Sequence, residues 1–137
     1  MADIRKVTED FSVAPQLEPG DMAGAAAQGF ALVINNRPDG EVPGQPSNAE
    51  MEAAARAAGM DYVQIPFAGR PGDEQVQAVL DAYEGAGGKP VLAFCRSGTR
   101  SITAWSMGQA KAGRRPREEL LKLGAGAGYD LSGALAG

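Results

Sequence analysis

Short apolar runs recur along the chain and predict five strands. They are IRKV (4–7), FSVA (11–14), FALVIN (30–35), YVQIPF (62–67) and VLAFC (91–95). The run at 91–95 is apolar throughout, which is typical of a strand in the buried middle of a parallel sheet. Turn-forming residues separate the runs, above all in NRPDGEVPGQPS (36–47), which predicts a loop.

The segments between the runs show helical spacing of apolar residues. They predict helices at 18–28, from a capping box at 47–50 to Gly59, at 73–84, at 101–112 and from REELLKL (117–123) onward. In the third of these, Val76, Val79, Leu80 and Tyr83 form one apolar face. The Gly- and Ala-rich end of the chain is expected to be loosely held beyond Tyr129 and Leu131.

Alternating strands and helices predict an α/β fold. We expect three layers, in which a central, mostly parallel sheet of about four to five strands is flanked by helices. A length of 137 residues lies within the range of one domain, and the chain shows no internal repeat. Residues 1–137 are therefore predicted to form a single catalytic domain.

Charge and composition exclude several partners. The net charge is −4 and the sequence pI is about 4.8, which argues against binding to nucleic acid or to an anionic membrane surface. One cysteine cannot build a disulfide framework. The start MADIRKVTEDF lacks the apolar core of a signal peptide, and the longest mostly apolar stretch, 30–34, is too short to span a bilayer. We expect a cytoplasmic protein.

The chain contains no histidine, which narrows the possible chemistry. Ser-His-Asp and Cys-His catalysis are excluded, and a lone thiol with carboxylates is a poor zinc site. We therefore expect neither a metal nor another cofactor.

The only cysteine, Cys95, lies between the predicted strand 91–95 and the predicted helix 101–112. That connection falls at the carboxyl end of a parallel sheet, where open α/β folds bind ligands. Amide groups of the loop and the positive end of the helix form an anion-binding nest, for which Gly98 supplies conformational freedom. The predicted anion-binding loop comprises Arg96, Ser97, Gly98, Thr99, Arg100 and Ser101.

Each of these residues also has a structural interpretation. Free cysteines are often small buried hydrophobes, but the Gly- and Arg-bearing turn favours a reactive thiolate at Cys95. Arg96 is either a surface charge or a ligand of the anion, whereas Arg100, beside the helix start, is expected to face the anion. Ser101 is either a helix N-cap or a hydrogen-bond donor to the thiolate.

Several motifs resemble known proteins. CRSGTRS (95–101) is similar to the active loop of rhodanese-type sulfurtransferases. Together, INNRPDGE (34–41), GQPS (44–47), YVQIP (62–66) and VLAFCRSGTRS (91–101) resemble the bacterial beta-lactamase-hydrolase-like, phosphatase-like family. This resemblance implies a protein-tyrosine-phosphatase-like fold, Cys95 as the nucleophile, and Arg100 with the loop amides as the anion clamp.

The sequence also departs from the phosphatases, whose signature is H-C-x-x-x-x-x-R. Phe94 stands in place of the histidine, and only four residues separate Cys95 from Arg100. The shorter loop better matches the sulfane-sulfur cradle of single-domain rhodaneses.

The general acid of dual-specificity phosphatases also lacks a counterpart in register. Where they carry an aspartate soon after the strand that resembles YVQIP, this chain has Phe-Ala-Gly at 67–69. Asp73 is a candidate acid or a first-turn helix charge. Asp39 is a candidate acid or a turn-shaping residue.

Three functions are consistent with this pattern. The leading hypothesis is sulfur transfer from thiosulfate or a persulfide through a Cys95 persulfide to a thiol acceptor, with a possible sulfide-metabolism enzyme as partner. The alternative is a phosphatase that hydrolyses phosphomonoesters through a Cys95 phosphoenzyme, with Asp39 or Asp73 as general acid. The third is a non-catalytic domain that binds an anion or a sulfur species.

Overall fold

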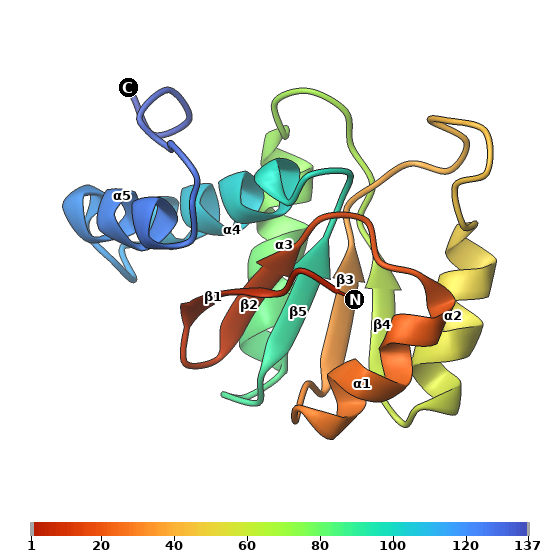
Figure 1. Cartoon of the computed structure of the whole chain (residues 1–137). Coiled ribbons are helices and arrows are strands. Elements are labelled where there is room, and N and C mark those ends of the chain that lie inside the picture. The colour runs from red at the N-terminus through yellow and green to blue at the C-terminus, as the bar shows by residue number, and fades with distance from the viewer. Residues whose placement is uncertain (1, 137) are drawn as a thin grey trace.

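A five-stranded sheet forms the centre of the molecule (Figure 1). The computed structural model describes residues 2–136. The strands are β1 (Arg5–Thr8), β2 (Phe11–Ala14), β3 (Leu32–Asn35), β4 (Asp61–Gln64) and β5 (Val91–Phe94), in the spatial order β1-β2-β5-β3-β4. Only β1 is antiparallel to its neighbour. The mostly parallel α/β sheet predicted from the sequence is confirmed.

Helices cover both faces of the sheet (Figure 1). They are the 3-10 turn η1 (Pro19–Asp21) and the α-helices α1 (Met22–Ala27), α2 (Asn48–Ala57), α3 (Asp73–Gly85), α4 (Thr99–Lys111) and α5 (Arg117–Gly126). Buried residues of α1 and α2 share one core cluster, and those of α3, α4 and α5 share the other. The expected three layers are therefore present.

Strand β5 is central because it pairs with β2 on one side and with β3 on the other. Its side chains alternate between the two cores, as the pleat of a strand requires. Val91 and Ala93 pack beneath α3, α4 and α5, whereas Leu92 and Phe94 pack beneath α1 and α2. Both faces of β5 are covered, which explains its continuously apolar sequence.

Most element boundaries lie within two residues of the sequence predictions, and three of the differences have a clear local cause. The predicted helix 18–28 is divided into η1 and α1, because the Asp21 carboxylate accepts the Glu18 N–H at 2.8 Å and closes a tight turn. Strand β4 ends before Pro66, which has no N–H to donate to a ladder. Helix α4 begins at Thr99, two residues early, because Gly98 adopts a left-handed conformation (φ 89°) and serves as its N-cap.

Three loops lie at the carboxyl end of the parallel strands, at the top of Figure 1. They are the β3–α2 loop (36–47), the β4–α3 loop (65–72) and the cysteine loop (95–101, which includes the first turn of α4). Arg100 of the cysteine loop hydrogen-bonds to Glu41 of the first loop and to the Phe67 carbonyl of the second. The fold thus brings together segments that are far apart in the sequence.

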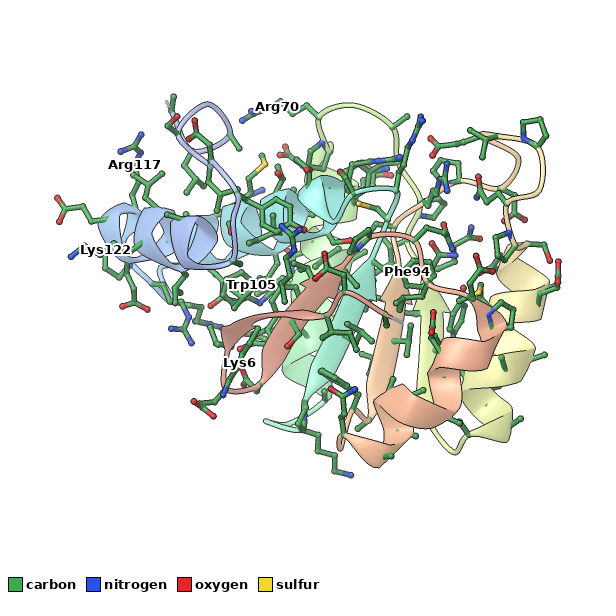
Figure 2. All side chains as sticks on the ribbon, viewed as in Figure 1. Lys6, Arg70, Phe94, Trp105, Arg117 and Lys122 are labelled. Atoms are coloured by element: carbon green, nitrogen blue, oxygen red, sulfur yellow. The ribbon has the colours of Figure 1, made fainter. Side chains whose placement is uncertain are left out.

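The C-terminal segment after α5 is more firmly anchored than its composition predicts. Tyr129 and Leu131 are buried. Beyond them, Arg70 donates to the Ala134 carbonyl at 3.2 Å and Arg117 donates to the Leu135 carbonyl at 2.8 Å; Figure 2 labels both arginines. Side chains from outside the segment therefore hold its backbone, and the Gly and Ala content of the segment does not predict these contacts.

None of the helices within residues 2–136 combines the length and the apolar character that crossing a membrane requires.

Candidate active site

Cys95 directly follows β5 and is completely buried. Its sulfur accepts a hydrogen bond from the Gly98 N–H at 3.1 Å. The left-handed conformation of Gly98 folds the chain back so that this amide reaches the sulfur, a turn that a residue with a Cβ makes only with strain. The cysteine therefore lies at the base of its loop, capped by a backbone donor.

In the cysteine loop, backbone carbonyls have partners, whereas several backbone N–H groups do not. Its carbonyls are bound by surrounding groups, since Arg96 O accepts the Gln16 N–H at 3.2 Å and Ser97 O accepts the Tyr129 hydroxyl at 2.8 Å. The amides of Arg96 and Ser97 donate to no group of the described residues. Among the first N–H groups of α4, that of Thr99 donates to the Ser97 hydroxyl at 3.4 Å, whereas those of Arg100 and Ser101 have no acceptor within residues 2–136. These four unpaired amides, on either side of the bonded pair at Gly98 and Thr99, suit an oxyanion.

Arg100 projects from the first turn of α4, and its side chain is 17% exposed. The two terminal nitrogens of its guanidinium donate to the two carboxylate oxygens of Glu41, at 2.9 and 2.8 Å. One of these nitrogens also donates to the Phe67 carbonyl at 3.0 Å. The Glu41 carboxylate, with a smaller contribution from the Cys95 sulfur, raises the pKa of Arg100. The arginine predicted to clamp an anion is thus fixed near the thiol.

Glu41 is a member of the site that the sequence analysis did not single out. It lies between two guanidinium groups, because Arg37 also donates to it at 2.6 Å. These hydrogen bonds, first that of Arg100 and then that of Arg37, lower the pKa of Glu41 to about 2. The four-residue spacing of Arg37 and Glu41 within INNRPDGE was the available sign of a local ion pair.

Arg37 itself is almost fully buried, with a side chain that is 4% exposed. Besides Glu41, it donates to the Gln16 side-chain oxygen at 3.1 Å. Gln16 also donates its backbone N–H to Arg96 O in the cysteine loop. A continuous set of hydrogen bonds therefore joins the β3–α2 loop, the chain after β2 and the cysteine loop.

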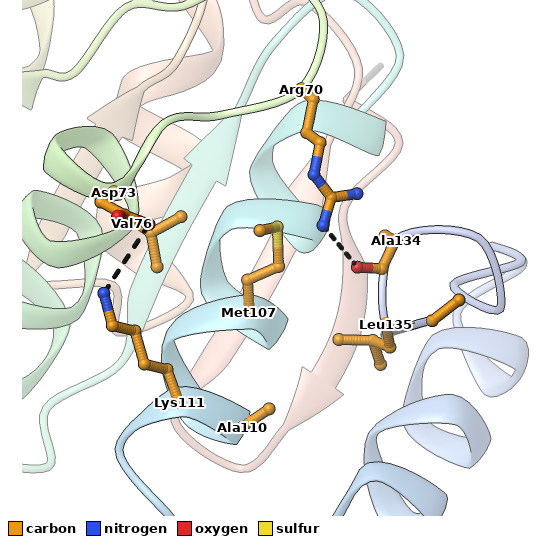
Figure 3. A pocket seen from close by; sticks show the side chains of 9 residues that line it. Arg70, Asp73, Val76, Met107, Ala110, Lys111, Ala134 and Leu135 are labelled. Atoms are coloured by element: carbon orange, nitrogen blue, oxygen red, sulfur yellow. Dashed lines mark hydrogen bonds and ion pairs between the residues drawn. The ribbon is translucent and has the colours of Figure 1, made fainter.

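The two aspartates predicted as candidate acids contact other groups. Asp39 accepts the backbone N–H of Asn48, at the start of α2, at 2.7 Å. Asp73, at the start of α3, pairs with Lys111 at 3.7 Å (Figure 3). Neither carboxylate is bonded to Cys95 or Arg100 in the described part of the chain. Their role as acids stays a prediction.

Asp73 lines a cavity of about 300 Å³ between α3, α4 and the C-terminal segment (Figure 3). Met107, Lys111 and Leu135 contribute to the same cavity, and Cys95 does not. The side chain of Asp73 is 93% exposed.

The remaining predicted loop residues fall into two groups. Arg96, Ser97 and Thr99 are exposed, and the Ser97 hydroxyl donates to the Thr99 hydroxyl at 2.9 Å. Ser101 is fully buried, and its hydroxyl finds no partner among residues 2–136. Because Gly98 is the N-cap of α4, Ser101 lies inside the helix and does not cap it.

Comparisons with known proteins agree with this arrangement. Residues 3–112 match the family model described as the beta-lactamase hydrolase-like protein, phosphatase-like domain. The beta-lactamase hydrolase-like proteins of Agrobacterium fabrum and Xylella fastidiosa are 41% and 35% identical over 130 residues, or 94% of this chain. The matched part is 30% of the length of each of these relatives.

Solved structures show the same fold. A protein of Neisseria meningitidis, described as a candidate phosphatase, is 30% identical with a TM-score of 0.80, over 95% of this chain and 92% of that one. Tk-PTP in its active form is 22% identical with a TM-score of 0.71, over 93% of this chain and 86% of that one. The match to the family model spans most of the chain and confirms the resemblance noted in the sequence. The chain belongs to the family of phosphatase-like domains of the beta-lactamase hydrolase-like proteins.

Proposed function

We propose that this domain is a cysteine-dependent phosphatase that hydrolyses phosphomonoesters through a Cys95 phosphoenzyme. One observation carries the proposal: the Cys95 sulfur lies at the base of a loop whose free amides and fixed arginine can surround an anion. The phosphatase description of the matching family and of the Neisseria structure supports this function better than sulfur transfer.

Arg100 retains the donors that a phosphoryl group needs. Its contacts with Glu41 and Phe67 use both protons of one terminal nitrogen and one proton of the other. The Nε proton and one terminal proton lie on the same edge of the guanidinium and are not used by these contacts. This edge is suited to bind two phosphoryl oxygens at once, which fixes their orientation and offsets their charge.

The proposed reaction has two steps. The Cys95 thiolate attacks phosphorus, a sulfur–phosphorus bond forms, and the bond to the ester oxygen breaks, so that the oxygen leaves with the electron pair and takes up a proton. Water then attacks phosphorus and gives a proton to the aspartate that protonated the leaving oxygen, the sulfur–phosphorus bond breaks with its electron pair on sulfur, and inorganic phosphate leaves Cys95 as the thiolate. In both steps the loop amides and Arg100 stabilise charge on the phosphoryl oxygens.

The leaving oxygen needs a proton, and Glu41 is a poor source of it. With its pKa lowered to about 2 by two arginines, this carboxyl group is ionised at neutral pH. Asp39 and Asp73 remain the proposed acids. Either must release its present partner, the Asn48 amide or the Lys111 ammonium group, to reach the ester oxygen.

Steady-state hydrolysis of an aryl phosphate tests this function. We expect Cys95→Ser to lower kcat/KM at least about 10³-fold, and replacement of the acting aspartate by asparagine to lower it about 10²-fold or more. The other Asp→Asn variant is the matched control and should remain near the parent. If Cys95→Ser hydrolyses the ester as fast as the parent, the proposal is wrong.

Sulfur transfer is the second candidate because only four residues separate Cys95 from Arg100, which makes a small cradle. In that reaction Cys95 would take a sulfane sulfur from thiosulfate or a persulfide and pass it to a thiol acceptor. Release of sulfite requires no general acid, so Asp39→Asn and Asp73→Asn should both retain this activity. A parent protein that turns over thiosulfate but no phosphoester would favour this function; one that turns over neither would indicate a binding domain.

A further inference from the structure

Tyr129 contacts the cysteine loop from outside the matched family domain. It follows α5, whereas the family match ends at residue 112. Its hydroxyl donates to the Ser97 carbonyl at 2.8 Å. Burial raises the pKa of Tyr129; the Arg5 guanidinium opposes this effect and the nearby Cys95 sulfur adds to it, and the net rise keeps the hydroxyl protonated at neutral pH.

The position of Tyr129 is fixed from two sides. Its backbone N–H donates to the Gly124 carbonyl at 2.8 Å, within the turn that ends α5. The guanidinium of Arg5, on β1, lies 5.2 Å from the centre of its ring, and Arg5 also donates to the Ala127 carbonyl at 3.3 Å. Tyr129 as a whole is 9% exposed. The Tyr129 hydroxyl is therefore held in one position beside the cysteine loop.

One peptide unit, between Ser97 and Gly98, connects the Tyr129 hydroxyl to the Cys95 sulfur. The Ser97 carbonyl and the Gly98 N–H belong to the same planar, trans peptide, so they point in opposite directions. The carbonyl points to the Tyr129 hydroxyl, and the N–H points to the Cys95 sulfur at 3.1 Å. A hydrogen bond on one side of this peptide sets the direction of the donor on the other side.

The Tyr129 hydroxyl packs tightly against the backbone of Gly98. A Cβ placed on it would overlap the Tyr129 hydroxyl oxygen and lie 3.4 Å from the Ala14 carbonyl carbon. The tyrosine oxygen thus occupies the space beside Gly98 that any other residue would fill.

We propose that Tyr129 is a positioning residue that orients the Ser97–Gly98 peptide so that its N–H stabilises the Cys95 thiolate. The inference deepens the proposed function, since it rests on Cys95 as the nucleophile. It also extends the active-site structure to α5 and the segment that follows it.

Ultraviolet absorbance of the thiolate, followed against pH, tests this role without any substrate. Because Cys95 is the only cysteine, the difference between each protein and its Cys95→Ser counterpart reports on that thiol alone and removes tyrosine ionisation. Tyr129→Phe should raise the midpoint of thiolate formation by about one pH unit, the order expected when a hydrogen bond to an ionised group is weakened.

Tyr83→Phe is the matched control. It removes a hydroxyl that donates to Asp10 at 2.7 Å, in the aromatic cluster of Phe11 and Trp105. Its midpoint should equal that of the parent. An unchanged midpoint in Tyr129→Phe, or an equal rise in both variants, would overturn the proposal.

A double-mutant cycle gives a second readout. Gly98→Ala should raise the midpoint strongly in the parent, and less so in Tyr129→Phe, where the overlapping oxygen is absent. Strictly additive shifts would contradict the proposed coupling. A coupled shift in a protein that fails to hydrolyse phosphoesters would leave the role of Tyr129 intact and reject only the proposed phosphatase function.

Discussion

The cysteine loop and the β3–α2 loop lie at the same end of the sheet but are built differently. In the turn of the cysteine loop, 95–98, backbone groups make the main contacts, including the Gly98 N–H to the Cys95 sulfur. In the β3–α2 loop, charged side chains do so, with Glu41 between Arg37 and Arg100. The first loop provides the Cys95 sulfur and the backbone amides, and the second holds the Arg100 guanidinium through Glu41.

This difference determines how each loop responds to substitution. Charged side chains can be replaced one at a time by mutation, whereas the backbone amides of a loop are moved only by changing the backbone conformation. Substitutions in the β3–α2 loop should therefore change pH dependence and catalytic rate by graded amounts. Substitutions at the turn of the cysteine loop should disturb folding and catalysis together.

The largest expected effect is on catalysis, at the residue that joins the two loops. Arg100→Lys removes the planar guanidinium, which contacts Glu41 through one edge and is proposed to bind the phosphoryl group through another. We expect kcat/KM for an aryl phosphate to fall about 10²–10³-fold, as on loss of an oxyanion donor. Arg114→Lys is the control, because it breaks a similar but exposed fork to Glu84. Equal activity in Arg100→Lys and the parent would show that Arg100 does not take part in catalysis.

The next effect is on stability and compares a glycine from each loop. Gly98 and Gly40 both have positive φ, 89° and 74°, but only Gly98 is crowded. Gly40→Ala should cost about 1–2 kcal/mol through its backbone conformation alone. Gly98→Ala should cost roughly 3 kcal/mol or more, because overpacking adds to the strain. Urea unfolding measures both, and equal losses would show that Tyr129 does not restrict Gly98.

The smallest effect concerns Glu41. Because its pKa is lowered from 4.5 to about 2 in the folded state, Glu41 contributes stability above pH 4.5, and this contribution is lost as the pH falls toward 2. Glu41→Gln should remove that part of the pH dependence of unfolding and lower kcat/KM about tenfold, since Arg100 loses a charged partner.

Glu84→Gln is the control for this measurement, since Arg114 also lowers the pKa of Glu84, but in an exposed pair. Its activity should match that of the parent. If unfolding of Glu41→Gln keeps the full acid dependence of the parent, the ion pairs of Glu41 do not stabilise the fold.

The parts of the structure that the sequence predicted depend on local signals. The apolar run 91–95 identified β5, and Ser47 with Glu50 forms the capping box that begins α2. The Gly-containing turn after Cys95 predicted where the cysteine loop lies, because strand, turn and helix follow one another directly in the chain.

The contacts that the sequence did not predict are long-range. Glu41 and Arg100 are 59 residues apart, and Tyr129 is 32 residues from the Ser97 carbonyl that it binds. No periodicity or spacing encodes such contacts, since they arise only when the sheet brings loop ends together. For the same reason the sequence did not predict the partner of Asp73, because its contact with Lys111 depends on how α3 packs against α4.

Intact-mass spectrometry of the quenched enzyme tests the central claim most directly. After brief reaction with an aryl phosphate, the parent should gain the mass of one phosphoryl group on Cys95, and Cys95→Ser should gain none. Parallel exposure to thiosulfate should leave the mass of the parent unchanged. A gain of one sulfur from thiosulfate with no phosphoryl gain from the ester would contradict the account and make sulfur transfer the function of this loop.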